Sequence, residues 1–366
     1  MHSELLCQLA LTLVPNVGDV HAKILVQQLG DAASVFKAKT TTLEKVEGIG
    51  DVRARAIKSF ADWHMAEAEL KFIEKYKIQP LFLTDEAYPK RLLNCYDSPT
   101  LLFYKGSTDL NASKVVAIVG TRSNTDYGKA FTEKLVADLA AQEVIIISGL
   151  AYGIDAIAHK AALKCNLPTI GVVGHGMNKI YPSQHAALAK EMIAEGGGLI
   201  TEFFHDIKPD KHNFPLRNRI VAGMSDATIL VETAIKGGSM ITAKLADGYN
   251  RDVFAVPGRT TDKVSAGCNH LIKYNKAILL TDAAELIEVM GWKEKKTTVK
   301  KQRELFIELT ADEKNIVSLL QAKDMVHIDE INSGSNLSSS SVASAILSLE
   351  LQGVVQSRPG KMYKLI

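Results

Sequence analysis

Four glycine-bearing loops carry the residue types that could do chemistry in this sequence. Each loop follows a short run of β-branched residues, and the four loops cover residues 119–123, 148–155, 174–182 and 232–239. Glycine allows a backbone to approach an anion closely, and helix N-termini supply oriented N–H donors. A single loop of this kind serves a tight turn, whereas four at one sheet edge predict an anion-binding cleft.

The candidate phosphate contacts combine these glycines with nearby hydroxyl and cationic side chains. They are Gly120, Thr121, Arg122, Ser148, Gly149, Gly153, Gly176, Lys179, Arg217, Arg219, Gly237, Gly238 and Ser239. Two of the arginines lie two positions apart. Together with Lys208, Lys211 and His212 upstream, they could meet successive phosphates or a bound carboxylate. Alternatively, an arginine there pairs with Glu202 or Glu232 and braces the sheet, and we expect this of at least one of them.

Two aromatic residues adjoin these basic segments, which we interpret as loops. Tyr181 and Phe214 are candidates for stacking on an unpaired base, because every base offers a π-face to an aromatic ring. Either ring can equally well belong to the core.

Acidic residues and histidines are interpreted as structural. Asp155 and His159 are four positions apart and share one helix face, which suits an acid–base or metal pair but also a brace for the loop. We favour the brace for both, and for Glu232. The other histidines lack ligand spacing, so neither a metal nor a catalytic residue is expected.

Nucleotide cofactors are disfavoured as well. No GxGxxG motif opens the first helix of the alternating region, and GxxxxGK[ST] does not occur in the sequence.

The elements that must position these loops lie between residues 114 and 290. There, short β-branched runs alternate with amphipathic helices. The predicted strands are 115–119, 144–147, 169–173, 199–201, 228–231, 253–256 and 278–280. Near-continuous apolar strands alternating with helices indicate an α/β fold with a mostly parallel sheet covered on both faces. A ligand of such a sheet lies beyond the carboxyl ends of its strands.

The flanking regions differ in character. Residues 1–75 predict helices with two glycine turns, at 13–18 and 46–50, that fit a helix–hairpin–helix or SAM-like domain facing a phosphate, or a packing hairpin without a ligand. We expect residues 292–304 to be a basic linker. Three helices and a terminal hairpin in 305–366 predict a winged helix. Its third helix, near 337–350, has no Arg, Lys, Asn or Gln, so we do not expect it to read duplex DNA.

Composition limits the function classes. Lys and Arg total 43 against 41 Asp and Glu in 366 residues, a net charge of +2. A basic coat is therefore excluded, and nucleic-acid contacts must be local. No apolar stretch is long enough for a membrane span. The N-terminal segment lacks the basic region of a signal peptide, which favours a cytoplasmic protein. The four cysteines form no CxxC pair, so we expect free thiols in a reducing compartment.

Six sequence blocks resemble the DNA-processing protein A family, also called DprA or Smf. They are VAIVGTR ending at Arg122, SGLAYGIDAIAH at 148–159, GVVGHGMNKIYP at 171–182, FPLRNRIVAG at 214–223, GGSMITA at 237–243 and VFAVPGR at 253–259. The resemblance implies an extended Rossmann-like, doubly wound domain over 76–291. It also implies a homodimer that binds single-stranded DNA, protects incoming strands and loads the RecA recombinase in natural transformation.

Three departures from the family pattern concern single segments. Gly237-Gly238-Ser239 stands where SGS is common. Asn275-Lys276-Ala277 stands where a glycine pair is common, and Ser183 stands where lysine is frequent after Tyr-Pro.

The alternative function is a phosphoribohydrolase-like enzyme on a related fold. Those enzymes carry a PGGxGTxxE pattern, in which the glutamate follows the glycines. In this chain Glu232 precedes Gly237-Gly238 instead. We therefore expect a binding protein with no cofactor rather than an enzyme.

Overall fold

The computed structural model describes residues 2–293 and 309–366. Contacts divide the chain into two compact units, Met1–Ile278 and Leu279–Ile366. Apart from its first two residues, the predicted linker over 292–304 lies outside the described residues.

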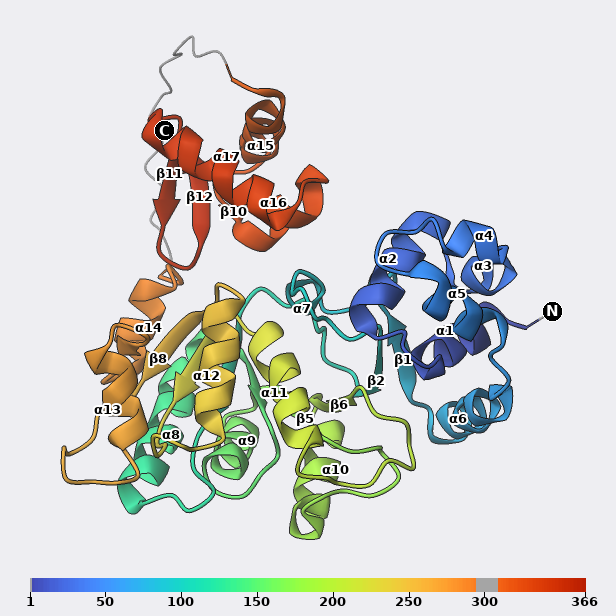
Figure 1. Ribbon diagram of the computed structural model, residues 1–366. Helices are drawn as coiled ribbons and strands as arrows, with labels where there is room; N and C mark the ends of the chain where they lie inside the picture. Colours follow the sequence, from blue (N-terminus) through green and yellow to red (C-terminus); the bar gives the residue numbers. More distant parts are fainter. Residues whose placement is uncertain (1, 294–308) are drawn as a thin grey trace. The chain divides into compact units, whose positions relative to one another are not determined.

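A nine-stranded sheet forms the centre of the first unit (Figure 1). Its strands are β1 Gln79–Phe82, β2 Leu101–Gly106, β3 Val115–Val119, β4 Ile145–Ser148, β5 Thr169–Val172, β6 Gly198–Thr201, β7 Ala227–Leu230, β8 Asp252–Ala255 and β9 Ile278–Leu279. Their order is β1-β2-β6-β5-β4-β3-β7-β8-β9. Strands β3 to β8 pair in parallel, while β2 runs antiparallel to both β1 and β6. The predicted mostly parallel α/β sheet is confirmed.

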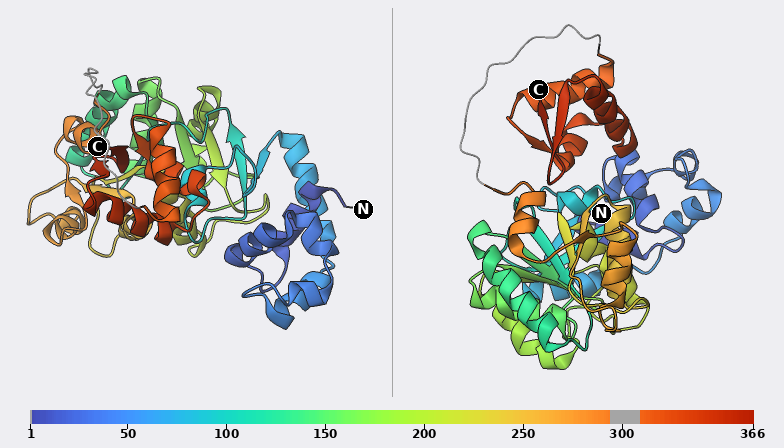
Figure 2. Two further views of the ribbon diagram at one scale, coloured as in Figure 1. Left: turned by 90° about the horizontal axis from the view of Figure 1, so that it is seen from above. Right: turned by 90° about the vertical axis from the view of Figure 1, so that its left-hand side faces the viewer.

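The helices of this region follow the strands in the expected alternation. They are α7 Lys90–Leu93, α8 Asp126–Leu139, α9 Ile154–Lys164, α10 Ala186–Ala194, α11 Asn213–Gly223, α12 Ser239–Gly248 and α13 Ala266–Lys273, with 3-10 turns at Ala140–Gln142 and Ser183–His185. Helices α8 and α9 pack together, as do α11 and α12, and the two pairs cover opposite faces of the sheet (Figures 1 and 2). The sheet is thus doubly wound.

Burial explains why the parallel strands were visible in the sequence. Every residue of β3, β4, β5, β6 and β7 is buried, and each of these strands is rich in valine, isoleucine or leucine. Such strands read as continuous apolar runs because helices cover both faces. The sequence did not predict β1 and β2, since Pro80 interrupts the first and the second is poor in β-branched residues.

Six helices precede the sheet: α1 Glu4–Leu13, α2 Asp19–Leu29, α3 Ala32–Lys37, α4 Thr40–Leu43, α5 Gly50–Lys58 and α6 Trp63–Tyr76. The two predicted glycine turns lie before α2 and before α5. The side chain of Arg53 joins these turns, because its Nε donates to Asn16 O at 2.8 Å and its Nη1 to Gly48 O at 3.2 Å.

The helix that follows the first of these turns contacts the sheet region through its first residue. The Asp19 carboxylate at the start of α2 accepts hydrogen bonds from the N–H and the hydroxyl of Thr100, both at 2.8 Å. The first residue of α2 therefore serves the packing of the helices against the sheet region.

The second unit contains α14 Ala283–Val289, α15 Ala311–Gln321, α16 Ile328–Ser335 and α17 Ser339–Leu351, with strands β10 Val326–His327, β11 Val355–Arg358 and β12 Met362–Leu365. The predicted three helices and terminal hairpin are present, around a core that includes Ile316, Ile331 and Leu349. None of the helices in the described part of the chain is both long and apolar enough to cross a bilayer.

Candidate functional site

A cavity lies where the sheet changes its winding direction. Strands β3 and β7 are neighbours, but the helices that follow them, α8 and α12, cover opposite faces. The two loops separate at this point and leave a crevice beyond the strand ends. The cavity there has a volume of about 730 Å³, within the range of small-ligand sites.

One side of the cavity combines a cation with two aromatic rings. The exposed Arg122, in the loop after β3, places its guanidinium 5.6 Å from the centre of the Phe214 ring. Phe214, in the first turn of α11, has its ring centre 5.9 Å from that of Tyr181, with 31° between the ring planes. Within the described ranges, no hydrogen bond or ion pair engages the Arg122 guanidinium. All three residues line the cavity.

The loop before α11 adds a second exposed cation. Lys211 lines the cavity together with Pro209 and Asp210. The sequence prediction named Lys211 only as one of the basic residues upstream of the two arginines, and the structure places it in the cavity lining.

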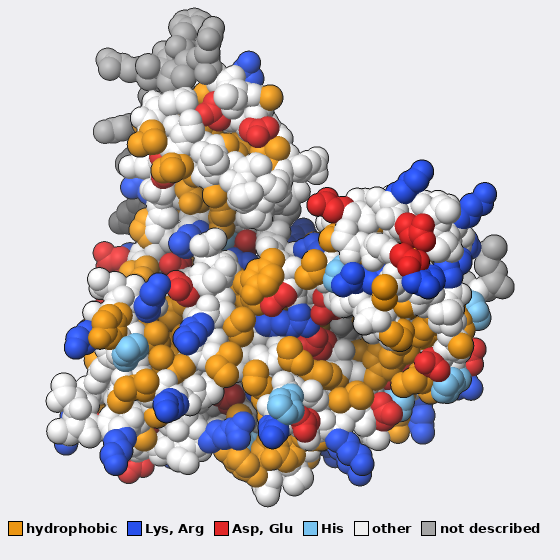
Figure 3. Space-filling view, in the orientation of Figure 1, with side chains coloured by type: hydrophobic (Ala, Val, Ile, Leu, Met, Phe, Trp, Pro, Cys, Tyr) orange, Lys and Arg blue, Asp and Glu red, His pale blue; other side chains and the backbone are white. Residues whose placement is uncertain are grey.

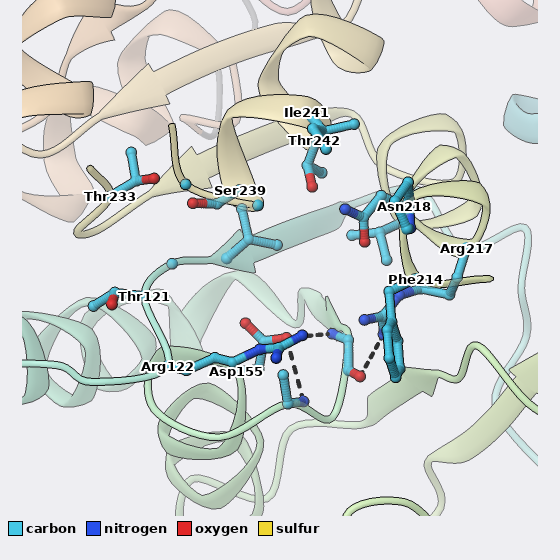
Figure 4. A pocket seen from close by; sticks show the side chains of 18 of the residues that line it. Thr121, Arg122, Asp155, Phe214, Arg217, Asn218, Thr233, Ser239, Ile241 and Thr242 are labelled. Carbon is cyan, nitrogen blue, oxygen red and sulfur yellow. Dashed lines mark hydrogen bonds between the residues drawn. The ribbon is translucent and has the colours of Figure 1, made fainter. Parts of the chain in front are cut away.

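The opposite side of the cavity is the N-terminus of α12. Gly237, Gly238 and Ser239 line it, and the first N–H groups of a helix carry a partial positive charge. The Ser239 side chain is buried, and its hydroxyl finds no hydrogen-bond partner among the described residues. Figure 4 shows Ser239 across the cavity from Arg122 and Phe214. An anion between them would receive donors from both sides.

Arg217 lies at the base of the cavity and is buried. Its Nη1 donates to the carbonyl of Gly149 (Figure 4) and to that of Val172, and so ties the ends of β4 and β5 together. Burial lowers the pKa of Arg217 to about 10, with Asp155 opposing and Arg122 adding to this shift. A Cβ on Gly149 would come within 2.3 Å of this guanidinium, so a larger residue there would displace the Arg217 side chain.

Arg219 faces the other side of α11, away from the cavity. Its guanidinium binds the carboxylates of Glu202 and Asp19 and the carbonyl of Asp97. Burial alone would disfavour the charged form, but the two carboxylates outweigh it and raise the pKa of Arg219. Assigning Arg219 to phosphate binding is therefore wrong, and the alternative of an arginine paired with Glu202 holds.

Asp155 and His159 make separate contacts and do not form a pair. The Asp155 carboxylate accepts the N–H groups of Gly149 at 3.1 Å and Ala151 at 3.4 Å, which shapes the loop after β4. Burial raises the pKa of Asp155, against the effect of Arg217. The fully buried His159 contacts the Thr169 hydroxyl through Nδ1 at 2.6 Å. Burial, with His185 and Arg217 adding to it, lowers the pKa of His159 to about 3.

Glu232, at the end of β7, points away from the cavity. Its carboxylate accepts hydrogen bonds from the N–H and hydroxyl of Thr125, the N-cap of α8. It therefore holds the start of that helix, which is a bracing contact.

The remaining candidates divide between lining and scaffold. Gly120 and Thr121 line the cavity, whereas Ser148 is buried and donates to Ile118 O. Gly153 has a φ of 76°, and a Cβ there would lie 2.2 Å from Thr121 O, so glycine permits the contact between two loops.

Two candidates on the loop after β5 do not line the cavity. The N–H of Gly176 is taken by Ile207 O at 2.9 Å, so it cannot bind a phosphate in this arrangement. The assignment of Gly176 to phosphate binding is wrong for that reason. Lys179 is exposed on the same loop, outside the cavity lining, and stays a prediction.

The fold and the cleft define a class: a doubly wound α/β protein whose open, donor-rich crevice suits an anionic ligand with a flat ring. On the face shown in Figure 3, basic and acidic side chains are interspersed, so attraction for an anion must be local, as the net charge indicates.

The chain belongs to the DNA recombination-mediator protein A family, known as DprA or Smf. The model of that family matches residues 79–291, and a DprA winged helix domain matches residues 304–361. Protein Smf of Synechocystis is 33% identical over 99% of both chains. DNA processing protein DprA of Streptococcus pneumoniae is 39% identical over 58% of this chain and 75% of its own.

Two solved structures show the same fold. The X-ray structure of DNA processing protein A from Streptococcus pneumoniae covers 78% of this chain and 97% of its own, with a TM-score of 0.66 and 31% identity. The structure of DNA processing protein A from Helicobacter pylori, described for its single-stranded DNA binding mode, covers 59% of this chain and 96% of its own, with a TM-score of 0.53 and 32% identity.

Proposed function

We propose that the chain binds single-stranded DNA in the cleft between β3 and β7. The observation that carries this proposal is the arrangement of Arg122 over Phe214, beside Tyr181, at the edge of a cavity whose far side is a helix N-terminus. Aromatic rings stack on bases, while cations and helix N–H groups contact phosphates.

The stacking geometry favours single strands over duplex. A base can stack on Phe214 or Tyr181 only with a free face, and the bases of a duplex already stack on one another. The Helicobacter pylori relative, described as binding single-stranded DNA, supports the same ligand for this chain.

We extend the proposal to the role that family membership suggests. The chain would act in the cytoplasm as a homodimer, protect incoming single strands and load RecA recombinase onto them during natural transformation. Light scattering at several protein concentrations tests the dimer. Strand exchange by RecA on strands already covered by a single-strand-binding protein, with and without this chain, tests the loading. An unchanged exchange rate would contradict it.

An enzyme acting on nucleoside monophosphates is the rival function. Glu232 is the carboxylate nearest the glycine pair in sequence, but its hydrogen bonds to Thr125 commit it to α8. This supports a binding role. Incubation with nucleoside monophosphates and detection of the released base tests the rival, which requires steady release in proportion to protein.

The experiment for the proposed function is a binding titration with fluorescent single- and double-stranded oligonucleotides over a salt series. Arg122→Ala is the test variant. Lys190→Ala, which removes an exposed cation of α10 outside the cavity lining, is its matched control. We expect single-strand preference, and loss of affinity in the test variant only. Equal binding of both DNA forms would contradict the proposal.

A further inference from the structure

A buried carboxylate of helix α6 binds the segment that supplies one wall of the cleft. The segment between β6 and α11 supplies Lys211 to the cavity lining, and His205 lies near its start. The His205 N–H donates to Glu69 at 3.2 Å to Oε1 and 2.9 Å to Oε2, and its Nδ1 lies 2.6 Å from Oε2. Only 2% of the Glu69 side chain is exposed. One side chain of the N-terminal helices thus fixes both the backbone and the ring of His205.

The same anchor reaches the neighbouring loop, which carries Tyr181. The N–H of Gly176 donates to Ile207 O at 2.9 Å, and the N–H of Asn178 donates to His205 O at 3.3 Å. A Cβ on Gly176 would lie 2.0 Å from Phe204 O, so the two loops are in direct backbone contact. Displacing residues 204–207 would therefore move both loops.

The ring of His205 is held from a second side by the same helix. The Phe72 ring stacks on it, with 4.3 Å between ring centres and 16° between planes. Burial raises the pKa of Glu69, and its hydrogen bonds to His205 oppose this. A buried carboxylate is costly unless its partners are fixed, and losing it leaves those partners unsatisfied. Glu69 thus defines where His205 lies.

We infer that Glu69 is a positioning residue for the cleft, acting through His205 and without contact to DNA. It orients the loop that presents Lys211 and, through Gly176, the loop that presents Tyr181. The inference rests on the proposed function, because it names what places the binding groups. It assigns the N-terminal helices a part in binding that needs no DNA contact of their own.

The sign of the effect separates this role from simple electrostatics. Removing a negative charge should by itself tighten the binding of a polyanion. We expect the opposite for Glu69→Ala: an affinity for a fluorescent oligo-dT strand lower by about fivefold to tenfold, the size of one weakened stacking contact. Glu67→Ala, which removes an exposed charge from the same helix, should leave affinity unchanged or slightly higher. Glu69→Gln keeps the shape and one acceptor, and should recover most of the loss.

A double-variant cycle with Lys211→Ala tests whether the effect passes through the cleft. If Glu69 positions Lys211, the double variant should lose less affinity than the product of the two single-variant fold losses. Fully multiplicative losses, or a folded Glu69→Ala chain that binds as well as the original, would overturn the inference. If circular dichroism shows that Glu69→Ala does not fold, His205→Ala replaces it, since that variant keeps the backbone N–H bonds to Glu69. We then expect a loss of about threefold, and unchanged affinity would overturn the inference.

The outcome also separates this inference from the proposed function. If Arg122→Ala weakens binding while the Glu69 and His205 variants do not, only the positioning role fails. If the unaltered chain does not bind oligo-dT, the proposed function itself fails.

Discussion

Replacing Arg122 by alanine should weaken single-strand binding in a salt-dependent way. The Arg122 guanidinium is exposed, lines the cleft and has no carboxylate partner in the described chain, so we treat it as one phosphate contact. Each phosphate neutralised on a single strand contributes about 0.7 to the slope of log K against log salt. Losing one contact therefore raises Kd by about fivefold at roughly 0.1 M salt and about twofold at roughly 0.3 M.

The assay is fluorescence anisotropy of a labelled oligo-dT strand at four or more salt concentrations. It compares the original chain with Arg122→Ala and with Lys190→Ala, whose side chain does not line the cavity. The affinity of Arg122→Ala should be lower than that of the original chain at low salt and should approach it as salt rises. Lys190→Ala should show no such convergence. A folded Arg122→Ala chain with an unchanged slope would refute the assignment of Arg122 to phosphate.

Four further predictions follow from other residues. Phe214→Ala should weaken single-strand binding by about 1–3 kcal/mol at every salt concentration, because stacking releases no counterions; a changed slope in anisotropy titrations would contradict this. Arg219→Ala should lower the free energy of unfolding by about 3–5 kcal/mol in urea titrations, since it leaves Glu202 buried without its partner; a loss under about 1 kcal/mol would refute the bracing role. Because His159 stays neutral in the fold down to a pH of about 3, only the unfolded chain gains its proton as pH falls below 6.5. Between about pH 7 and 5, the free energy of unfolding of the original chain should therefore fall by about 2 kcal/mol more than that of His159→Asn. Equal losses in the two chains would contradict a neutral His159 in the fold. A chain ending at residue 304 should keep most of its single-strand affinity, since the exposed positions of α17 carry serine, alanine and leucine and no cations; a loss above about tenfold would contradict this.

The ends of the parallel strands could be predicted to within about two residues, because strands that are buried on both faces have continuous apolar sequences. For example, β3 was predicted over 115–119 and is Val115–Val119. The convergence of the glycine loops at one sheet edge follows from the same pattern. Strand β2 could not be found this way, since Leu101–Gly106 lacks β-branched residues and pairs antiparallel at the side of the sheet.

The roles of the two arginines needed the structure. Residues two apart in a helix point in directions about 200° apart, so Arg217 meets the strand ends while Arg219 meets Glu202. The prediction treated this segment as a basic loop, whereas Asn213–Gly223 forms α11. Lys211 could be named only as a basic residue upstream of these arginines. Its place in the cavity depends on a loop held by Glu69, which is far away in the sequence.

Photocrosslinking of a strand that carries 5-iododeoxyuridine tests the central claim most directly, because a stacked base reacts with the ring beside it. Mass spectrometry of the digested complex locates the attached nucleotide. The account predicts attachment at Tyr181 or Phe214, and its loss from the Phe214 peptide in Phe214→Ala. Attachment confined to residues 2–76 or 309–366 would contradict the claim that the cleft binds the strand.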